Sequence, residues 1–208
     1  MENVTDRLSN PFGMSAPCDP FVPGYGDANA HFQVIGDHPG VHGGADSGVP
    51  FTGTATAERL QCALVAAGLL ETPGTPPTVD RTFLSYLYPC PPDDGEPTDA
   101  DYAALEPIFD AELRAITAHV LLPVGERATA YVLRNYTARS PPDDLAAAHA
   151  AEVPGGGFLV YPIKDPGEWT DDDERALVAA LRELRETDYR READLGRFVA
   201  DADPYLVR

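Results

Sequence analysis

The sequence predicts an α/β protein, a three-layer α/β/α sandwich with a central four-stranded parallel sheet. Two observations lead to this prediction: four short apolar or β-branched runs alternate with four stretches of helical periodicity, and Gly, Pro or helix-capping residues separate them. Strands that alternate with helices in this way form parallel sheets with helices on both faces. The 208 residues are 43% hydrophobic, which is enough for one sizeable core.

The first part of the chain supplies two strands and one helix after an irregular start. Residues 1–30 are rich in Pro, Gly, Asn and Asp, and we expect an irregular arm that lies on the surface. Residues 32–35 form a short apolar run that opens into a glycine-rich loop, which is the pattern of a buried strand. A helix is expected at about residues 56–70, and the β-branched and aromatic run at 82–88 predicts a second strand.

The second part continues the alternation. Thr98 and Asp101 stand in a capping-box relation, so a helix begins at Thr98. A strand at residues 119–124, a helix at 126–136 and a strand at 157–163 follow.

Thr170 and Asp173 together cap the start of a final helix. The side of this helix that faces the core carries Leu177, Leu181 and Leu184. The predicted organisation is therefore a domain at residues 31–187, preceded by the arm and followed by a C-terminal extension at 188–208.

The charge is strongly negative, because 34 Asp and Glu residues outweigh 15 Lys and Arg residues and give a formal charge of −19. Lys164 is the sole lysine of the chain. This composition is typical of a halophilic, salt-adapted surface, although a generic acidic cytosolic protein would carry the same charge. At molar salt the Debye length is about 3 Å, so the charge does not exclude a nucleic acid as partner.

The sequence also favours a cytoplasmic location. The longest apolar stretch, residues 62–70, is far shorter than the roughly 18 residues of a membrane span, and acidic Glu2 follows Met1. Three scattered cysteines are too few for a disulfide framework, which indicates a reducing compartment. We expect a monomer that binds no membrane.

The loop after residues 32–35 carries the most informative motif. Ligands of open parallel sheets bind at the carboxyl ends of the strands. Here the loop reads Gly36-Asp37-His38-Pro39-Gly40 and then Gly48-Val49-Pro50-Phe51-Thr52-Gly53. The two halves resemble the first motif of the uracil-DNA glycosylase superfamily, particularly of its iron–sulfur-type thermostable branch, Gly-Glu-x-Pro-Gly followed by Gly-x-Pro-Phe-x-Gly. Further segments resemble that branch in the same order at residues 88–92, 97–98, 106–107 and 120–128.

The resemblance implies hydrolysis of the N-glycosidic bond of a base that is flipped out of DNA. It places Asp37 at the acidic position that activates water, with His38 and Asp46 as weaker alternatives. It places Phe51 as the ring that stacks on the base. The backbone that approaches the substrate would be Gly36, Pro39, Gly40, Pro50 and Gly53. The plainer alternative is that Asp37 caps the loop and Phe51 is an ordinary core aromatic.

Two positions depart from the resembled branch. Its second-strand Asn reads the edge of the base, whereas Tyr86 stands there in our alignment, and a phenol offers a single hydroxyl. Its second motif, His-Pro-Ser, is matched by Asp165-Pro166-Gly167. Because an anionic Asp165 cannot donate to the leaving base, we predict that the adjacent Lys164 is an electrophilic or phosphate contact; a solvated surface lysine is the alternative.

We expect no cofactor. The resembled branch holds a four-iron cluster on four cysteines, and only Cys18 and Cys90 have counterparts here, as partial remnants. Leu105 stands where the partner of Cys90 would be, and Cys62 falls in an apolar helix as a buried thiol. A metal site at His38, His42, Asp37 and Asp46 is disfavoured, because Pro39 and Gly40 do not hold these side chains on one helical face.

The leading hypothesis is a DNA repair glycosylase, a monofunctional hydrolase that removes uracil or another deaminated base, with damaged DNA as its partner. The alternative is a catalytically impaired module of the same fold that binds nucleic acid or a partner. Tyr86 and Asp165 favour the alternative, whereas Asp37 and Phe51 oppose it. A small-molecule α/β enzyme is a third hypothesis, and the chain lacks the phosphate-loop and dinucleotide motifs that it would use.

Overall fold

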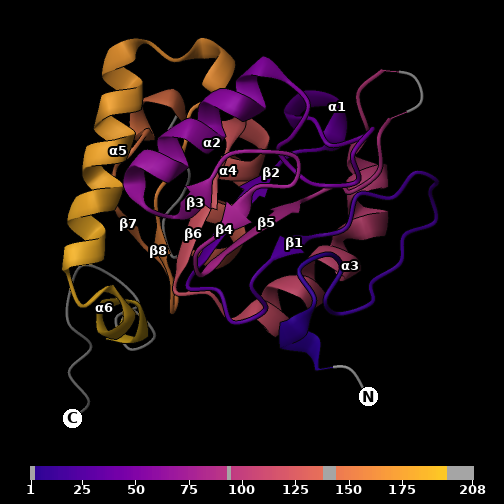
Figure 1. The fold of residues 1–208 in the computed structure, drawn as a ribbon, viewed down its shortest axis with the longest axis horizontal. Helices are drawn as coiled ribbons and strands as arrows, with labels where there is room; N and C mark the ends of the chain where they lie inside the picture. Colours follow the sequence, from indigo (N-terminus) through magenta and orange to yellow (C-terminus); the bar gives the residue numbers. More distant parts are fainter. Residues whose placement is uncertain (1–2, 93–94, 138–143, 196–208) are drawn as a thin grey trace.

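The centre of the molecule is a six-stranded, mostly parallel sheet in the order β1-β5-β2-β6-β8-β7 (Figure 1). The computed structural model describes residues 3–92, 95–137 and 144–195. The four inner strands are parallel, namely β5 (Thr82–Tyr86), β2 (Phe32–Gly36), β6 (Val120–Pro123) and β8 (Leu159–Val160). The α/β prediction is confirmed, and the four predicted strands are these inner four.

The predicted strand number is wrong, because two short antiparallel strands extend the sheet at its edges. β1 (Tyr25–Gly26) pairs with β5, and β7 (Val153–Pro154) pairs with β8. A separate hairpin joins β3 (Leu70–Thr72) to β4 (Thr78–Val79). Two- and three-residue strands are too short to show the alternation that sequence patterns rely on.

Six α-helices are found in the described residues, and four of them match the predicted ones. Thr98 and Asp101 bond each other's backbone N–H groups, and so do Thr170 and Asp173, so both predicted capping boxes are confirmed. The helices are α1 (Pro39–His42), α2 (Ala55–Ala67), α3 (Asp99–Ile116), α4 (Gly125–Tyr136), α5 (Asp171–Glu186) and α6 (Tyr189–Leu195).

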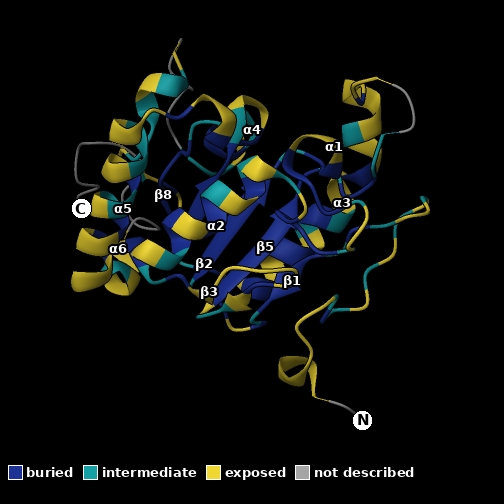
Figure 2. Ribbon diagram, turned by 45° about the horizontal axis from the view of Figure 1, so that its top comes forward, coloured by how far each residue is buried: buried dark blue, intermediate teal, exposed yellow. Residues whose placement is uncertain are grey.

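The helices cover the two faces of the sheet. Val34 joins a core that includes Leu64 of α2 and Leu181 of α5. Its neighbour Ile35 points to the other face and joins Leu113 of α3 together with residues of α4. The four inner strands are buried, while the helices keep exposed outer sides (Figure 2). The three-layer arrangement leaves the carboxyl ends of the parallel strands as the edge at which loops gather.

The N-terminal arm is largely irregular but does not lie wholly on the surface, so that expectation is wrong for its last part. Val22 is 1% exposed, and its N–H donates to the carbonyl of Pro89 over 2.9 Å. Tyr25 is buried in β1. The arm therefore adds the last strand on one side of the sheet.

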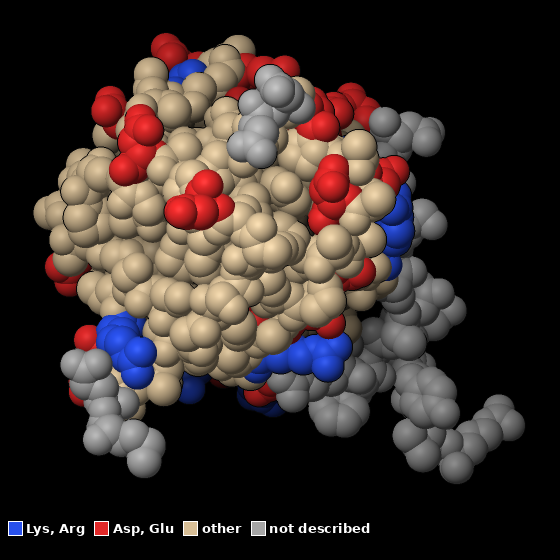
Figure 3. Space-filling model, turned by 90° about the vertical axis from the view of Figure 1, so that its right-hand side faces the viewer, with Lys and Arg blue, Asp and Glu red and all other residues tan. Residues whose placement is uncertain are grey.

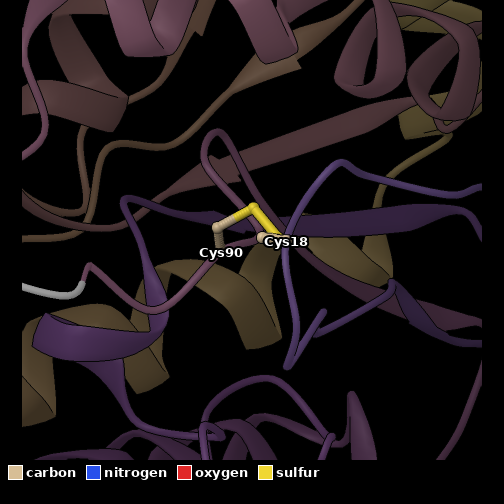
Figure 4. Close-up of a disulfide and its surroundings, with 2 residues drawn as sticks. All are labelled: Cys18 and Cys90. Carbon is tan, nitrogen blue, oxygen red and sulfur yellow. A yellow bond between two sulfur atoms is a disulfide. The ribbon is translucent and has the colours of Figure 1, made fainter.

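A disulfide joins Cys18 of the arm to Cys90, which follows β5 (Figure 4). This bond corrects the expectation of reduced cysteines. Cys62 is exposed on α2 and not buried as expected. Leu60 and Leu64 mark the buried side of that helix, and a residue two positions after Leu60 turns to the opposite side.

Part of the predicted C-terminal extension packs on the domain. The hydroxyl of Tyr189 lies 2.8 Å from Nδ1 of His31, and Ala193 is buried. Residues 196–208 lie outside the described part, and the domain limits stay a prediction. No helix within the described ranges is long and apolar enough to cross a lipid bilayer.

Candidate active site

A cavity of about 970 Å³ opens at the carboxyl ends of the parallel strands. Its size lies in the range of ligand sites in proteins. The residues that line it come from α1, α3 and α4, from the ends of the loops after β2, β5 and β8, and from residues 145–146. Those used below are Asp37, His42, Tyr102, Arg127, Lys164 and Asp165.

Asp37 reaches this cavity because it directly follows β2. The Tyr102 hydroxyl of α3 donates a short hydrogen bond to Oδ1 of Asp37. The guanidinium of Arg127 lies over the Tyr102 ring, 4.3 Å from its centre, and donates to Asp99 over 3.1 Å. Burial and the bonded Asp37 carboxylate raise the pKa of Tyr102, so this phenol remains a donor. The three side chains fix the carboxylate at the edge of the cavity.

Tyr86 does not line the cavity in this structure, and its contact with the base stays a prediction. It is 3% exposed. Its hydroxyl donates to the carbonyl of Gly43 and accepts from the N–H of Phe51, both over 2.7 Å. The phenol thereby joins the two halves of the glycine-rich loop, and its hydrogen-bonding capacity is spent inside the protein.

Phe51 also lies behind the cavity wall, and its predicted stacking on the base stays a prediction. The side chain is 1% exposed, and its ring centre lies 5.1 Å from that of Tyr86 and 5.5 Å from that of His42. Gly36 permits this packing, since a Cβ there would stand 2.7 Å from atoms of both Phe51 and Tyr86. The plainer interpretation of Phe51, a core aromatic, describes its position.

His38 is buried and does not line the cavity, and its catalytic role stays a prediction. Its Nδ1 accepts from the N–H of Gly40 over 3.1 Å and caps α1, and its Nε2 lies 3.1 Å from Glu96. Both ring nitrogens hold loops together. The remaining motif residues Pro39, Gly40, Pro50 and Gly53 shape the loop and do not line the cavity, and Asp46 is exposed outside it.

Lys164 and Asp165 do line the cavity, as predicted from the strand-end position. The ammonium of Lys164 lies 3.5 Å from Asp173, so it is partly neutralised by α5. Asp165 accepts from the N–H of Gly167 over 2.7 Å and caps a short turn. The predicted roles of both residues stay predictions, and their bonds to the turn and to α5 are not apparent from the sequence.

His42 also lines the cavity, although the sequence analysis included it only in the disfavoured metal site. It ends α1, is 3% exposed, and has an Nε2 without a hydrogen-bond partner among the residues described. Burial, the largest effect, lowers the pKa of His42, while Asp165 and Asp37 act in the opposite direction. The signal in the sequence that could have indicated this residue is the pair His42-Gly43 in the glycine-rich loop after β2.

The residues present do not fit an iron–sulfur cluster. A four-iron cluster uses four thiolates, whereas the chain has three cysteines. Cys18 and Cys90 are bonded to each other, and Cys62 is exposed on α2. No group of three or more His, Cys, Asp or Glu side chains placed to hold a metal ion is found in the described part of the chain.

Comparison with known proteins supports the resemblance. The family model of the uracil DNA glycosylase superfamily matches residues 23–185. The type-5 uracil-DNA glycosylase of Pyrobaculum aerophilum is 30% identical over 168 residues, which cover 78% of this chain and 73% of that protein.

Two other relatives match similar shares. The type-5 uracil-DNA glycosylase of Thermus thermophilus is 29% identical over 67% of this chain and 66% of its own length. The type-4 uracil-DNA glycosylase of Saccharolobus solfataricus is 24% identical over 82% of this chain and 73% of its own length. With the glycine-rich loop, the parallel sheet and the strand-end cavity, these matches show that the chain belongs to the uracil DNA glycosylase superfamily.

Proposed function

We propose that this protein is a DNA repair glycosylase that hydrolyses the N-glycosidic bond of uracil or another deaminated base in DNA. The observation that supports the proposal is that Asp37, in the loop that resembles the superfamily's first motif, lines the strand-end cavity. The relatives named above are uracil-DNA glycosylases, and the family match at residues 23–185 includes this loop.

The chemistry needs a negative group beneath the sugar. As the glycosidic bond lengthens, the sugar becomes cationic and the base anionic. The Asp37 carboxylate stabilises the sugar and accepts a proton from the attacking water. Tyr102 occupies Oδ1 of Asp37, which leaves Oδ2 for that water. The target nucleotide would flip out of the DNA helix into this cavity.

The supporting residues suggest the remaining features of the enzyme. We propose a monomer of the cytoplasm that works without an iron–sulfur cluster, because its cysteines do not suit one. The acidic composition supports a halophilic protein, and its DNA contacts would depend on Arg127, Arg134 and Lys164.

The test is an excision assay on single- and double-stranded oligonucleotides that carry uracil, hypoxanthine or xanthine, in 0.1 M and 2 M KCl. We expect an abasic product from at least one base. Asp37→Asn should slow its formation by 10²- to 10⁴-fold, which is the usual effect of a general base. Asp46→Asn is the matched control, since Asp46 lies in the same loop but is exposed.

Three outcomes are distinguishable. Product that is lost only in Asp37→Asn supports the proposal. Equal rates in Asp37→Asn and the unmodified protein contradict the role of Asp37. DNA binding without product from any base would instead support the catalytically impaired module.

A further inference from the structure

The unpaired nitrogen of His42 is the feature of the site that Asp37 chemistry leaves unexplained. His42 is 3% exposed, and its Nε2 has no hydrogen-bond partner among the described residues. A buried polar atom without a partner carries a free-energy cost, and proteins rarely keep one without a use. A ligand that bonds this nitrogen would remove the cost.

The ring of His42 borders the cavity that Asp37 and Asp165 also line. α4 begins beside it with Gly125, where a Cβ would stand 3.7 Å from Nε2. The glycine therefore adds no side chain over that edge of the ring. Nε2 itself has almost no exposed surface, so a group that enters the cavity beside Gly125 reaches it after a small shift of the ring or of the start of α4.

The ring is held from behind by the two aromatics that the resemblance had placed on the base. The His42 ring stacks on Tyr86 at an interplanar angle of 17°, with centres 6.3 Å apart. Phe51 packs against it at 5.5 Å. Tyr86 in turn locks the loop through Gly43 and Phe51. This support fixes the direction of Nε2, which is what recognition of a small rigid ligand needs.

We propose that Nε2 of His42 forms the hydrogen bond to the extruded base that the second-strand Asn and the second-motif His would form in the resembled branch. The inference rests on the proposed excision function and deepens it. Asp165 cannot donate to the base, and Tyr86 does not reach it. His42 is the buried polar group that remains free at the cavity wall.

A neutral imidazole suits the bases that deamination creates. Its two nitrogens comprise one donor and one acceptor. Uracil, hypoxanthine and xanthine each present an N–H beside a carbonyl on the edge that pairs in DNA. The other ring nitrogen bonds the backbone of Val124 and is therefore the donor of the neutral ring, so Nε2 accepts from the N–H of that edge. A protonated ring would instead donate from Nε2 to the carbonyl and stabilise the charge that develops on the departing base.

The test replaces the ring nitrogens and keeps the aromatic packing. His42→Phe should slow single-turnover excision by about 10²-fold, as loss of one transition-state hydrogen bond does. It should weaken binding about tenfold to DNA that carries a 2′-fluoro-substituted uridine, whose glycosidic bond resists hydrolysis. Binding to DNA with a tetrahydrofuran abasic site should change by less than about twofold, because that ligand has no base to contact.

Controls separate this role from a structural one. His31→Phe removes another partly buried histidine, one that bonds Tyr189 at the start of β2, and should excise at the normal rate. His42→Gln retains a polar group, so it should recover part of the lost rate. Circular dichroism and the thermal midpoint establish that each variant is folded.

Two results would overturn the inference. One is excision by His42→Phe at the normal rate; the other is an equal loss of affinity for the uridine and abasic ligands. If the unmodified protein excises no base, the proposed function fails. The inference is then judged by whether the unmodified protein prefers the uridine ligand and His42→Phe does not.

Discussion

At the scale of single residues, Tyr86 shows how one side chain organises the loop that forms the site. Phe51 adopts a φ of +57°, a conformation that non-glycine residues rarely take. Its N–H is bonded by Tyr86 and its carbonyl by Gln61 over 2.6 Å. The surrounding bonds hold the strained turn in place, and strain of this kind gathers at functional sites.

Tyr86→Phe should therefore destabilise the fold more than loss of a single hydroxyl does elsewhere. The change leaves the N–H of Phe51 and the carbonyl of Gly43 unpaired in the interior, at a combined cost of about 2–4 kcal/mol in the free energy of unfolding. Urea denaturation measures this value. Tyr161→Phe is the control, since it removes one bond to Glu152 and should cost about 1 kcal/mol or less. Equal losses of unfolding free energy in the two variants would contradict the role of Tyr86 in holding the loop together.

At the scale of elements, the sequence predicted what local patterns determine. Each capping box spans only four residues, from Thr98 to Asp101 and from Thr170 to Asp173. Both can therefore be predicted before any fold is known. The stacking of Tyr86 at the end of β5 on His42 of α1 joins residues that are 44 positions apart. No local sequence pattern predicts such a contact. That Asp37 lies at a binding site could be predicted from the sequence, because ligands of this fold class bind at the carboxyl ends of the strands.

The arm and α3 are coupled by a buried carboxyl, and this coupling predicts a pH dependence. Glu112 of α3 accepts from the N–H of Gly24, and burial raises the pKa of Glu112 to about 8. The unfolded chain ionises this group near its usual pKa of 4.5. Its stabilisation is therefore complete below about pH 4.5 and is lost as the pH rises towards 8.

Glu112→Gln should remove this dependence. Between pH 5 and 8 the variant should gain stability relative to the original protein, by at most about 1.4 kcal/mol per pH unit, because one proton is involved. Urea denaturation at each pH gives the difference. A difference that is constant over this range would show that Glu112 does not retain its proton in the folded protein.

The disulfide joins the same arm to the loop after β5, and its removal tests how far the arm contributes. Cys18 and Cys90 are separated by 72 residues, and closing a loop of this size typically stabilises by about 2–4 kcal/mol. Cys18→Ser should lower the free energy of unfolding by that amount under oxidising conditions, and Cys62→Ser, at an exposed position, by less than about 0.5 kcal/mol. If a reductant leaves the original protein as stable as before, the bond contributes nothing.

At the scale of the whole molecule, the charge of −19 makes salt a determinant of stability. Acidic side chains are spread over the face in Figure 3, and the basic ones lie at its margins, mostly along the lower edge. Self-repulsion destabilises such a compact state, and it is screened as the Debye length falls from about 10 Å at 0.1 M to about 3 Å at 1 M salt.

The thermal midpoint should accordingly rise by at least about 4 °C between 0.1 M and 2 M KCl, which corresponds to about 1–2 kcal/mol for a domain of this size. Differential scanning calorimetry measures the shift. Sucrose at equal osmolality is the control, because it favours burial without screening charge. A gain no larger in KCl than in sucrose would exclude charge screening as its cause.

The same charge distribution limits how strongly DNA binding can depend on salt. The cavity is lined by three cations, Arg127, Arg134 and Lys164, and by six carboxylates. Each phosphate that a cation neutralises contributes about −0.9 to the slope of log affinity against log salt. Three contacts therefore predict a slope no steeper than about −2.7, and repulsion by the carboxylates, which salt relieves, makes it shallower. Fluorescence anisotropy with abasic-site DNA from 0.1 to 2 M KCl gives this slope. A steeper slope would mean that DNA lies on a basic surface other than the one around Asp37.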